Sequence, residues 1–148
     1  RFDLKIECKG DIEVDCHHTV EDTAIVLGDA LKQALGEKKG IYRYGSFILP
    51  MDEALVMVAL DISGRGYLNY NVAIAAEKVG DFDTELGEEF MRAFSRVAGI
   101  TLHIEQLEGN NAHHILEAIF KGVARALRQA TAIDPAARDE IPSTKGVL

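Results

Sequence analysis

The middle of the chain has the pattern of short β-strands separated by turns. Between Tyr44 and Ala75, β-branched and aromatic residues dominate, and glycines and Pro50 interrupt them; such a texture predicts strands. We expect three strands, at Tyr44–Leu49, Leu55–Ile62 and Leu68–Ala75. The second is apolar along most of its length, which indicates a central position in the sheet.

A helical period follows the strands. Four apolar residues recur on one face of a helix, namely Leu86, Phe90, Phe94 and Val97. Either Asp83 or Thr84 has the side chain of a helix N-cap, so we expect a helix from Thr84 through about Ala98. The final segment, Asp134–Leu148, holds two prolines and many polar residues, which predicts a tail or an ordered loop.

The two ends of the chain repeat one another. The tetrapeptide Leu4–Glu7 is similar to Leu102–Glu105, and the signature HHxxE at residues 17–21 recurs at residues 113–117. The segments rich in alanine and leucine that follow the two signatures also match. We interpret this self-similarity as a duplicated strand–loop–helix unit.

The repeat divides the chain into unequal parts. We expect a pseudo-repeat 1 at residues 1–40, a pseudo-repeat 2 at residues 41–132 and a C-terminal tail at residues 133–148. Pseudo-repeat 2 has the helix Thr84–Ala98 before its HHxxE motif, whereas the chain opens directly on the first predicted strand. Pseudo-repeat 1 is therefore expected to lack an N-terminal strand and helix. Together the elements predict an α+β fold, with helices packed on one face of a mostly antiparallel sheet.

Composition restricts the class of protein. The 148 residues suffice for one domain, or for two small repeats that share a core. A net charge of −8 argues against a nucleic-acid partner, because duplex binding needs a basic face; a small anionic substrate remains compatible, since a few cations hold one phosphate. No apolar run is long enough for a membrane span, and the two cysteines give no disulfide framework. We expect a cytoplasmic protein.

The HHxxE motifs have the residue types and the spacing of metal ligands. On a helix, a glutamate three or four residues after a histidine shares a face with it, so the two side chains can bind one ion. Adjacent histidines point about 100° apart, so two motifs indicate two metal sites that draw ligands from several segments. Imidazole and carboxylate ligands suit Mn, Fe, Co, Ni or Zn. One such motif could equally lie on a solvated surface, but four of the five histidines fall in the two motifs, which favours metal binding.

Two polar residues near the motifs are expected to have supporting roles. His103 falls in the middle of a predicted strand, where packing or a hydrogen bond is expected. Asp22 directly follows the first motif and has no acidic counterpart in the second, where Ala118 stands. We expect Asp22 to cap the helix, to pair with an arginine or to orient a ligand histidine.

Several of these motifs resemble one family. The segments Gly10–Asp11 and His17–Asp22, together with Asn111–His114, Glu117–Lys121 and Ile141–Gly146, are similar to those of imidazoleglycerol-phosphate dehydratases. The similarity extends over essentially the whole chain. It implies a duplicated fold of the ribosomal protein S5 domain 2 type. It also implies dehydration of imidazole glycerol phosphate to imidazole acetol phosphate in histidine biosynthesis.

The resemblance also implies a set of site residues. Those that match the family's metal ligands are His17, His18, Glu21, His113, His114 and Glu117. Those that match its substrate-binding positions are Arg43, Arg65, Ser143, Thr144 and Lys145. Arginines beside glycines, with a lysine nearby, suit the binding of a phosphate group. Glu89 stands where some members have a ligand histidine, so we expect either a carboxylate ligand or a solvated glutamate.

For cofactors and partners, the resemblance implies two Mn²⁺ ions per active site and a homo-oligomeric 24-subunit shell whose sites are shared between subunits. The family's N-terminal helix with its Asp-His-Met motif, and an earlier substrate-binding glutamate, are missing from this sequence. We expect Glu21, Glu117 or that missing glutamate to move the proton during dehydration. Two other functions remain open at this point: a dinuclear metal hydrolase of phosphate esters, and a non-catalytic module in which metals only join subunits.

Overall fold

The fold is built around a four-stranded sheet in the computed structural model, which describes residues 2–148. The strands are β1 (Tyr44–Met51), β2 (Ala54–Asp61), β3 (Tyr67–Asn71) and β6 (Thr101–Glu108), in the order β1-β2-β6-β3. The pairs β1/β2 and β2/β6 are antiparallel, and β3 runs parallel to β6. Because β2 lies between β1 and β6, its predicted central position is confirmed.

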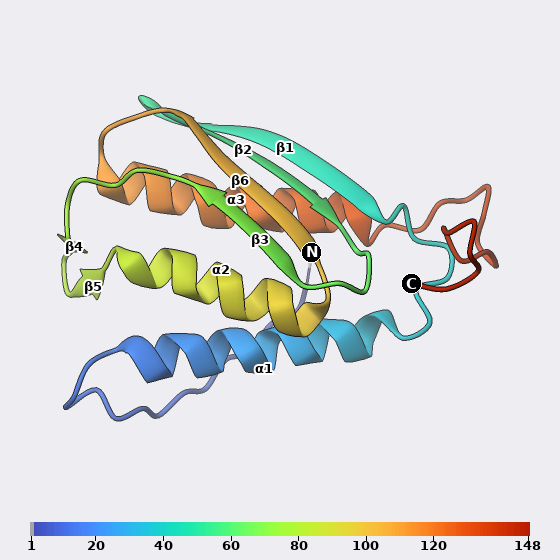
Figure 1. The fold of residues 1–148 in the computed structure, drawn as a ribbon, viewed down its shortest axis with the longest axis horizontal. Coiled ribbons are helices and arrows are strands. Elements are labelled where there is room, and N and C mark those ends of the chain that lie inside the picture. The colour runs from blue at the N-terminus through green and yellow to red at the C-terminus, as the bar shows by residue number, and fades with distance from the viewer. Residues whose placement is uncertain (1) are drawn as a thin grey trace.

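Two helices cover one face of this sheet, and a third helix forms a further layer (Figure 1). α3 (Ala112–Ala130) packs on β1 and β2, and α2 (Glu85–Ala98) packs beside β3. α1 (His17–Leu35) packs on α2. All three helices begin at the same end of the molecule, at the left of Figure 1. The predicted α+β class, with helices on one face of a mostly antiparallel sheet, is confirmed.

Alternation along the strands decides which face the helices cover. Every second residue of β2 is buried, and buried Val58 stands opposite Ile104 of β6. A Cβ added to Gly122 of α3 would lie 2.8 Å from the Val58 side chain, so α3 presses directly on this face. On the same face, Tyr70 of β3 pairs with Ile104, and its hydroxyl approaches Gly87 of α2. The core therefore forms between the sheet and these two helices.

The predicted first strand is wrong. Leu4–Glu7 has no strand or helix assignment and runs beside α1, where it lines a groove with Val26. A strand is stable only when a neighbour pairs its backbone N–H and C=O groups. The segment has the alternating apolar pattern of a strand, but within residues 2–148 no neighbouring strand pairs with it.

The predicted third strand is too long. β3 ends at Asn71, because the backbone N–H of Ala73 donates to Oε1 of Gln106 at 2.9 Å instead of to the β6 backbone. Before α2 the chain forms a small hairpin from β4 (Lys78–Val79) and β5 (Phe82–Asp83), which the sequence pattern does not predict.

The remaining predicted elements agree with the structure. The first two predicted strands in the middle of the chain are β1 and β2, and the predicted second helix is α2. α2 starts after Thr84 and ends at Gly99, whose φ of +68° favours glycine. The final segment forms turns without a helix or strand, as expected. Of the helices formed by residues 2–148, none is long and apolar enough to cross a membrane.

Candidate active site

The second HHxxE motif occupies the start of α3. Asn111 is the N-cap, and its Oδ1 accepts hydrogen bonds from the backbone N–H groups of His113 (2.9 Å) and His114 (3.2 Å). An asparagine at this position satisfies donors that the first helical turn leaves open. The cap therefore fixes both histidines at the beginning of the helix, with Glu117 one turn later.

His113 and Glu117 form the pair that the helical spacing predicts. Nε2 of His113 lies 3.2 Å from Oε2 of Glu117, so two donor atoms face the same small volume. Lys121 donates to the other oxygen of Glu117 at 2.5 Å, and this hydrogen bond lowers the pKa of the Glu117 carboxyl. An ionised carboxylate is the form that binds metal. Lys121 was not among the predicted site residues, although its four-residue spacing from Glu117 is a usable signal.

His114 points to a different partner. Its Nδ1 lies 2.7 Å from Oε2 of Glu53, which stands between β1 and β2. The other oxygen of Glu53 accepts backbone hydrogen bonds from Asn111 (2.8 Å) and Asn110 (3.3 Å). The His114 contact is the main cause that lowers the pKa of Glu53 to about 2, and the same contact raises the pKa of His114. Sequence analysis missed Glu53, because it lies outside both motifs.

The first HHxxE motif is placed similarly at the start of α1. Nδ1 of His18 lies 3.2 Å from Oδ2 of Asp11, and this contact raises the pKa of His18. Glu21 lies 3.8 Å from Nη2 of Arg96 on α2. In both motifs the adjacent histidine rings are 6.3 Å apart and steeply inclined, at 90° and 72°. The two rings of each motif therefore face different directions, and their binding of different ions stays a prediction.

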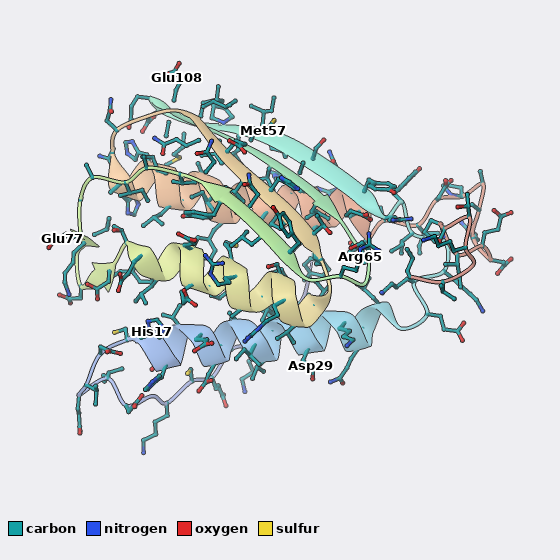
Figure 2. The ribbon with its side chains drawn as sticks, in the orientation of Figure 1. His17, Asp29, Met57, Arg65, Glu77 and Glu108 are labelled. Atoms are coloured by element: carbon teal, nitrogen blue, oxygen red, sulfur yellow. The ribbon has the colours of Figure 1, made fainter. Side chains whose placement is uncertain are left out.

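The structure does not bring the two motifs together. α2 lies between α1 and α3 in Figure 1, and Figure 2 shows His17 on the outer helix. Glu89 of α2 lies 3.9 Å from Nε of Arg92 on the same helix. Among residues 2–148, no three histidine, cysteine or acidic side chains are arranged to hold one metal ion. Metal ligation by Glu89 stays a prediction.

The donors that are present fit a transition metal in type. An imidazole nitrogen and an ionised carboxylate oxygen are suitable ligands for Mn²⁺ and its neighbours in the first row. His113 and Glu117 hold two such atoms 3.2 Å apart on an accessible surface. A four- to six-coordinate ion needs further donors, and those must come from outside this segment.

The predicted substrate-binding residues gather at the opposite end of the molecule. Arg43 donates to Asp61 through Nε (2.6 Å) and Nη2 (3.0 Å), and its Nη1 donates to the carbonyl oxygen of Pro142 at 2.8 Å. The Asp61 hydrogen bond raises the pKa of Arg43. All three guanidinium nitrogens of Arg43 thus donate hydrogen bonds within the chain. The bond to Pro142 holds the tail in place just before the Ser143–Lys145 segment.

Arg65 and the tail present exposed polar groups at this same end. Arg65 lies in the loop between β2 and β3, and Figure 2 labels it beside that end of the sheet. In the tail, the backbone N–H of Lys145 donates to the Ser143 hydroxyl at 3.3 Å, and Thr144 and Lys145 are exposed. The tail also touches the Arg65 loop, since a Cβ on Gly64 would lie 2.9 Å from the carbonyl carbon of Leu148.

About one helix length separates the histidine motif from these residues. The backbone N–H of Arg43 donates to the carbonyl oxygen of Ala130, at the end of α3, whereas His113 lies at its start. A rise of 1.5 Å per residue puts the two ends of this segment roughly 25 Å apart. The side chains suited to bind metal and those suited to bind an anion therefore lie at opposite ends of the molecule.

Comparisons with known proteins agree with the motifs. The family model for imidazoleglycerol-phosphate dehydratase matches residues 1–127. This range includes both HHxxE motifs and the two predicted substrate-binding arginines, Arg43 and Arg65. The imidazoleglycerol-phosphate dehydratase of Heliobacterium modesticaldum is 62% identical over 148 residues, which are 100% of this chain and 76% of that protein. The one from Azorhizobium caulinodans is 61% identical over 148 residues, or 100% of this chain and 75% of that protein.

Solved structures give the same result. The crystal structure of imidazoleglycerol-phosphate dehydratase from Staphylococcus aureus matches with a TM-score of 0.81 and 48% identity, covering 86% of this chain and 72% of that chain. A crystal structure of IGPD from Pyrococcus furiosus, in complex with (S)-C348, matches with a TM-score of 0.78 and 46% identity, covering 89% and 71% of the two chains. The chain belongs to the imidazoleglycerol-phosphate dehydratase family, whose members are hydro-lyases of histidine biosynthesis.

Proposed function

We propose that this hydro-lyase removes water from D-erythro-imidazole glycerol phosphate with two Mn²⁺ ions per active site, in sites that subunits share. The observation that carries the proposal is the separation of two kinds of groups within one chain. His113 lies at the start of α3 and Arg43 at its end, roughly 25 Å apart. A small phosphate ester cannot span this distance, so a complete site needs the two ends from different subunits.

The start of α3 is the metal-binding half of the proposed site. His113, His114 and Glu117 present imidazole and carboxylate donors there, and His17, His18 and Glu21 present the same set on α1. Ions held by these residues would supply Lewis-acid chemistry there, which would make the substrate C–H proton more acidic and assist the departure of hydroxide. The chain carboxylates that we propose for moving the proton are Glu21 and Glu117.

The other end of the molecule is the phosphate-binding half. Exposed Arg65 and Lys145 are cations, and the Ser143 hydroxyl is a further donor in the same tail. A guanidinium fork with a lysine point charge matches a phosphate group. Arg43 contributes by holding the tail through Pro142. Thr144 belongs to this phosphate-binding turn as well.

The proposal extends to assembly and location. A homo-oligomer brings the histidine end of one subunit to the arginine end of another, and the family resemblance points to 24 subunits in a closed shell. Closed symmetric assemblies of one chain are the usual form for soluble oligomers. We place the enzyme in the cytoplasm, with neither a nucleic acid nor a membrane as partner.

Replacing His113 with alanine tests the metal part of this proposal. We expect His113→Ala to abolish dehydration and to lower the bound Mn²⁺, because the ion loses one of two adjacent donors. Product formation and metal content of the purified protein are the measurements. His103→Ala is the matched control, since this exposed histidine on β6 lies beside the Tyr67 ring, outside both motifs. Unchanged turnover in His113→Ala contradicts the proposal.

A further inference from the structure

We propose that Glu53 is a positioning residue that holds the His114 imidazole with Nδ1 as the donor and Nε2 turned toward the metal, and that Asp11 does the same for His18. The inference rests on the proposed function, in which both histidines ligate metal. It concerns two carboxylates outside the HHxxE motifs.

Glu53 is held in place by contacts with both of its oxygens. Oε2 lies 2.7 Å from Nδ1 of His114, while Oε1 accepts the backbone N–H groups of Asn111 (2.8 Å) and Asn110 (3.3 Å). An ionised carboxylate only accepts hydrogen bonds, so Nδ1 must carry the proton in this pair. In a neutral imidazole the lone pair then lies on Nε2. Glu53 thus selects the tautomer and orients the ring at once.

The nitrogen that Glu53 leaves available is accessible. Nε2 of His114 makes no hydrogen bond within residues 2–148, and the carboxylate recorded beside it, Oδ2 of Asp52, is 3.5 Å away. That separation exceeds the usual hydrogen-bond range. The His114 side chain is 25% exposed, so an ion can reach Nε2 from the surface. Histidines that bind metal commonly donate their other N–H to a carboxylate in this way.

The first motif has the same contact from an unrelated position in the chain. Nδ1 of His18 lies 3.2 Å from Oδ2 of Asp11, seven residues earlier, whereas Glu53 is 61 residues before His114. Asp11 and Glu53 do not correspond in the repeat, because Asp11 lies in the turn before α1 and Glu53 lies in the turn between β1 and β2. Two different segments therefore hold the same nitrogen of the second histidine, which duplication alone does not explain.

Glu53→Gln separates positioning from simple structural support. The amide oxygen still accepts the backbone N–H groups of Asn110 and Asn111, but the amide N–H₂ now faces Nδ1 of His114. The imidazole proton moves to Nε2 and blocks the metal-facing nitrogen. We expect a loss of Mn²⁺ affinity of about 10- to 100-fold, with little change in the melting temperature of the metal-free protein. Asp11→Asn should weaken Mn²⁺ binding for the same reason.

The measurement is a Mn²⁺ titration of the purified protein, with the free ion counted by electron paramagnetic resonance. Glu108→Gln is the matched control, since this exposed carboxylate ends β6 near the β1–β2 turn without touching a histidine. Wild-type affinity in both Glu53→Gln and Asp11→Asn overturns the inference while the proposed function stands. Absence of Mn²⁺ binding in the wild-type protein overturns both.

Discussion

At the scale of single residues, two cations with low exposure, Arg43 and Lys38, differ in whether a carboxylate pairs with them. Arg43 is neutralised by Asp61 through two hydrogen bonds. Lys38 is only 9% exposed, and within residues 2–148 its ammonium group pairs with no carboxylate. Burial lowers the pKa of Lys38, and repulsion from Lys32 and Arg43 lowers it further. A buried, unpaired cation destabilises the folded state.

Removing this charge should stabilise the isolated protein. We expect Lys38→Met to raise the free energy of unfolding at pH 7 by about 1 kcal/mol, or the melting temperature by about 2–4 °C. The folded pKa lies below the ordinary 10.5, so the penalty is complete below the folded pKa and disappears as pH rises toward 10.5. The advantage of Lys38→Met should therefore shrink in alkaline buffer.

Thermal melts at several pH values check this effect. Lys9→Met is the control, because it removes an exposed lysine before α1 that does not act on the pKa of Lys38. A lower melting temperature for Lys38→Met at pH 7 would show that the cation stabilises the fold instead.

The same scale shows what sequence spacing can and cannot predict about the site. His113 and Glu117 were predictable as a pair, because four residues on a helix fix their separation whatever the rest of the chain does. Glu53 was not, since its contact with His114 depends on how the β1–β2 turn meets the start of α3. Arg43 was predicted as a substrate ligand, and its hydrogen bonds to Asp61 and Pro142 could not be foreseen from a local motif.

At the scale of elements, the contact between α1 and α2 is close because Gly28 has no side chain. A Cβ on Gly28 would lie 2.9 Å from the carbonyl oxygen of Phe94 and 3.2 Å from the backbone nitrogen of Ala98. Both neighbours belong to the backbone of α2, so neither can turn aside as a side chain would. The helices must separate to admit even one methyl group.

Gly28→Ala should therefore destabilise the protein despite the better helix propensity of alanine. We expect a loss of about 1–3 kcal/mol from overpacking, which exceeds the gain of about 0.5–1 kcal/mol from removing a helical glycine. Urea unfolding followed by circular dichroism is the measurement. Ala34→Val adds volume on the exposed side of α1 and should change stability little. Equal or greater stability in Gly28→Ala contradicts this packing.

Elements were predictable where the chain contains their partners. β1 and β2 are adjacent in sequence and pair with each other, so their alternating pattern is sufficient. Leu4–Glu7 has the same apolar alternation, but strand formation needs a paired neighbour that local pattern cannot reveal. The predicted length of β3 was wrong for a different reason. Its pairing with β6 stops where the Gln106 side chain accepts a hydrogen bond from the N–H of Ala73, and such a contact between distant segments cannot be predicted from a local pattern.

At the scale of the whole molecule, the dominant feature is that its two ends carry different kinds of functional group. The three helices run side by side and start at one end, where the histidine motifs lie, while Arg65 lies toward the other end of the sheet (Figures 1 and 2). In the proposed function, these two ends are the incomplete halves of a site that subunits share. The proposal therefore predicts that catalysis depends on assembly, because neither end has both the donors for metal and the cations for phosphate.

Mixed assemblies of two inactive variants test this dependence. His113→Ala removes a metal donor from one half, and Arg65→Ala removes a cation from the other. If subunits share sites, some sites in a co-expressed mixture combine an intact histidine end with an intact arginine end. We expect each variant alone to lack turnover and the mixture to regain a measurable fraction. Turnover is assayed on assemblies that carry two different affinity tags, which proves that both chains are present.

The informative control for this experiment pairs two changes in the same half. Co-expression of His113→Ala with Glu117→Ala leaves every histidine end defective, so no combination of subunits restores an intact site. Recovery in the first mixture and none in the second is the result that a shared site requires. If doubly tagged His113→Ala and Arg65→Ala assemblies stay inactive, the two ends serve one site within a subunit, and the roughly 25 Å between them would have to close by a large rearrangement of the chain.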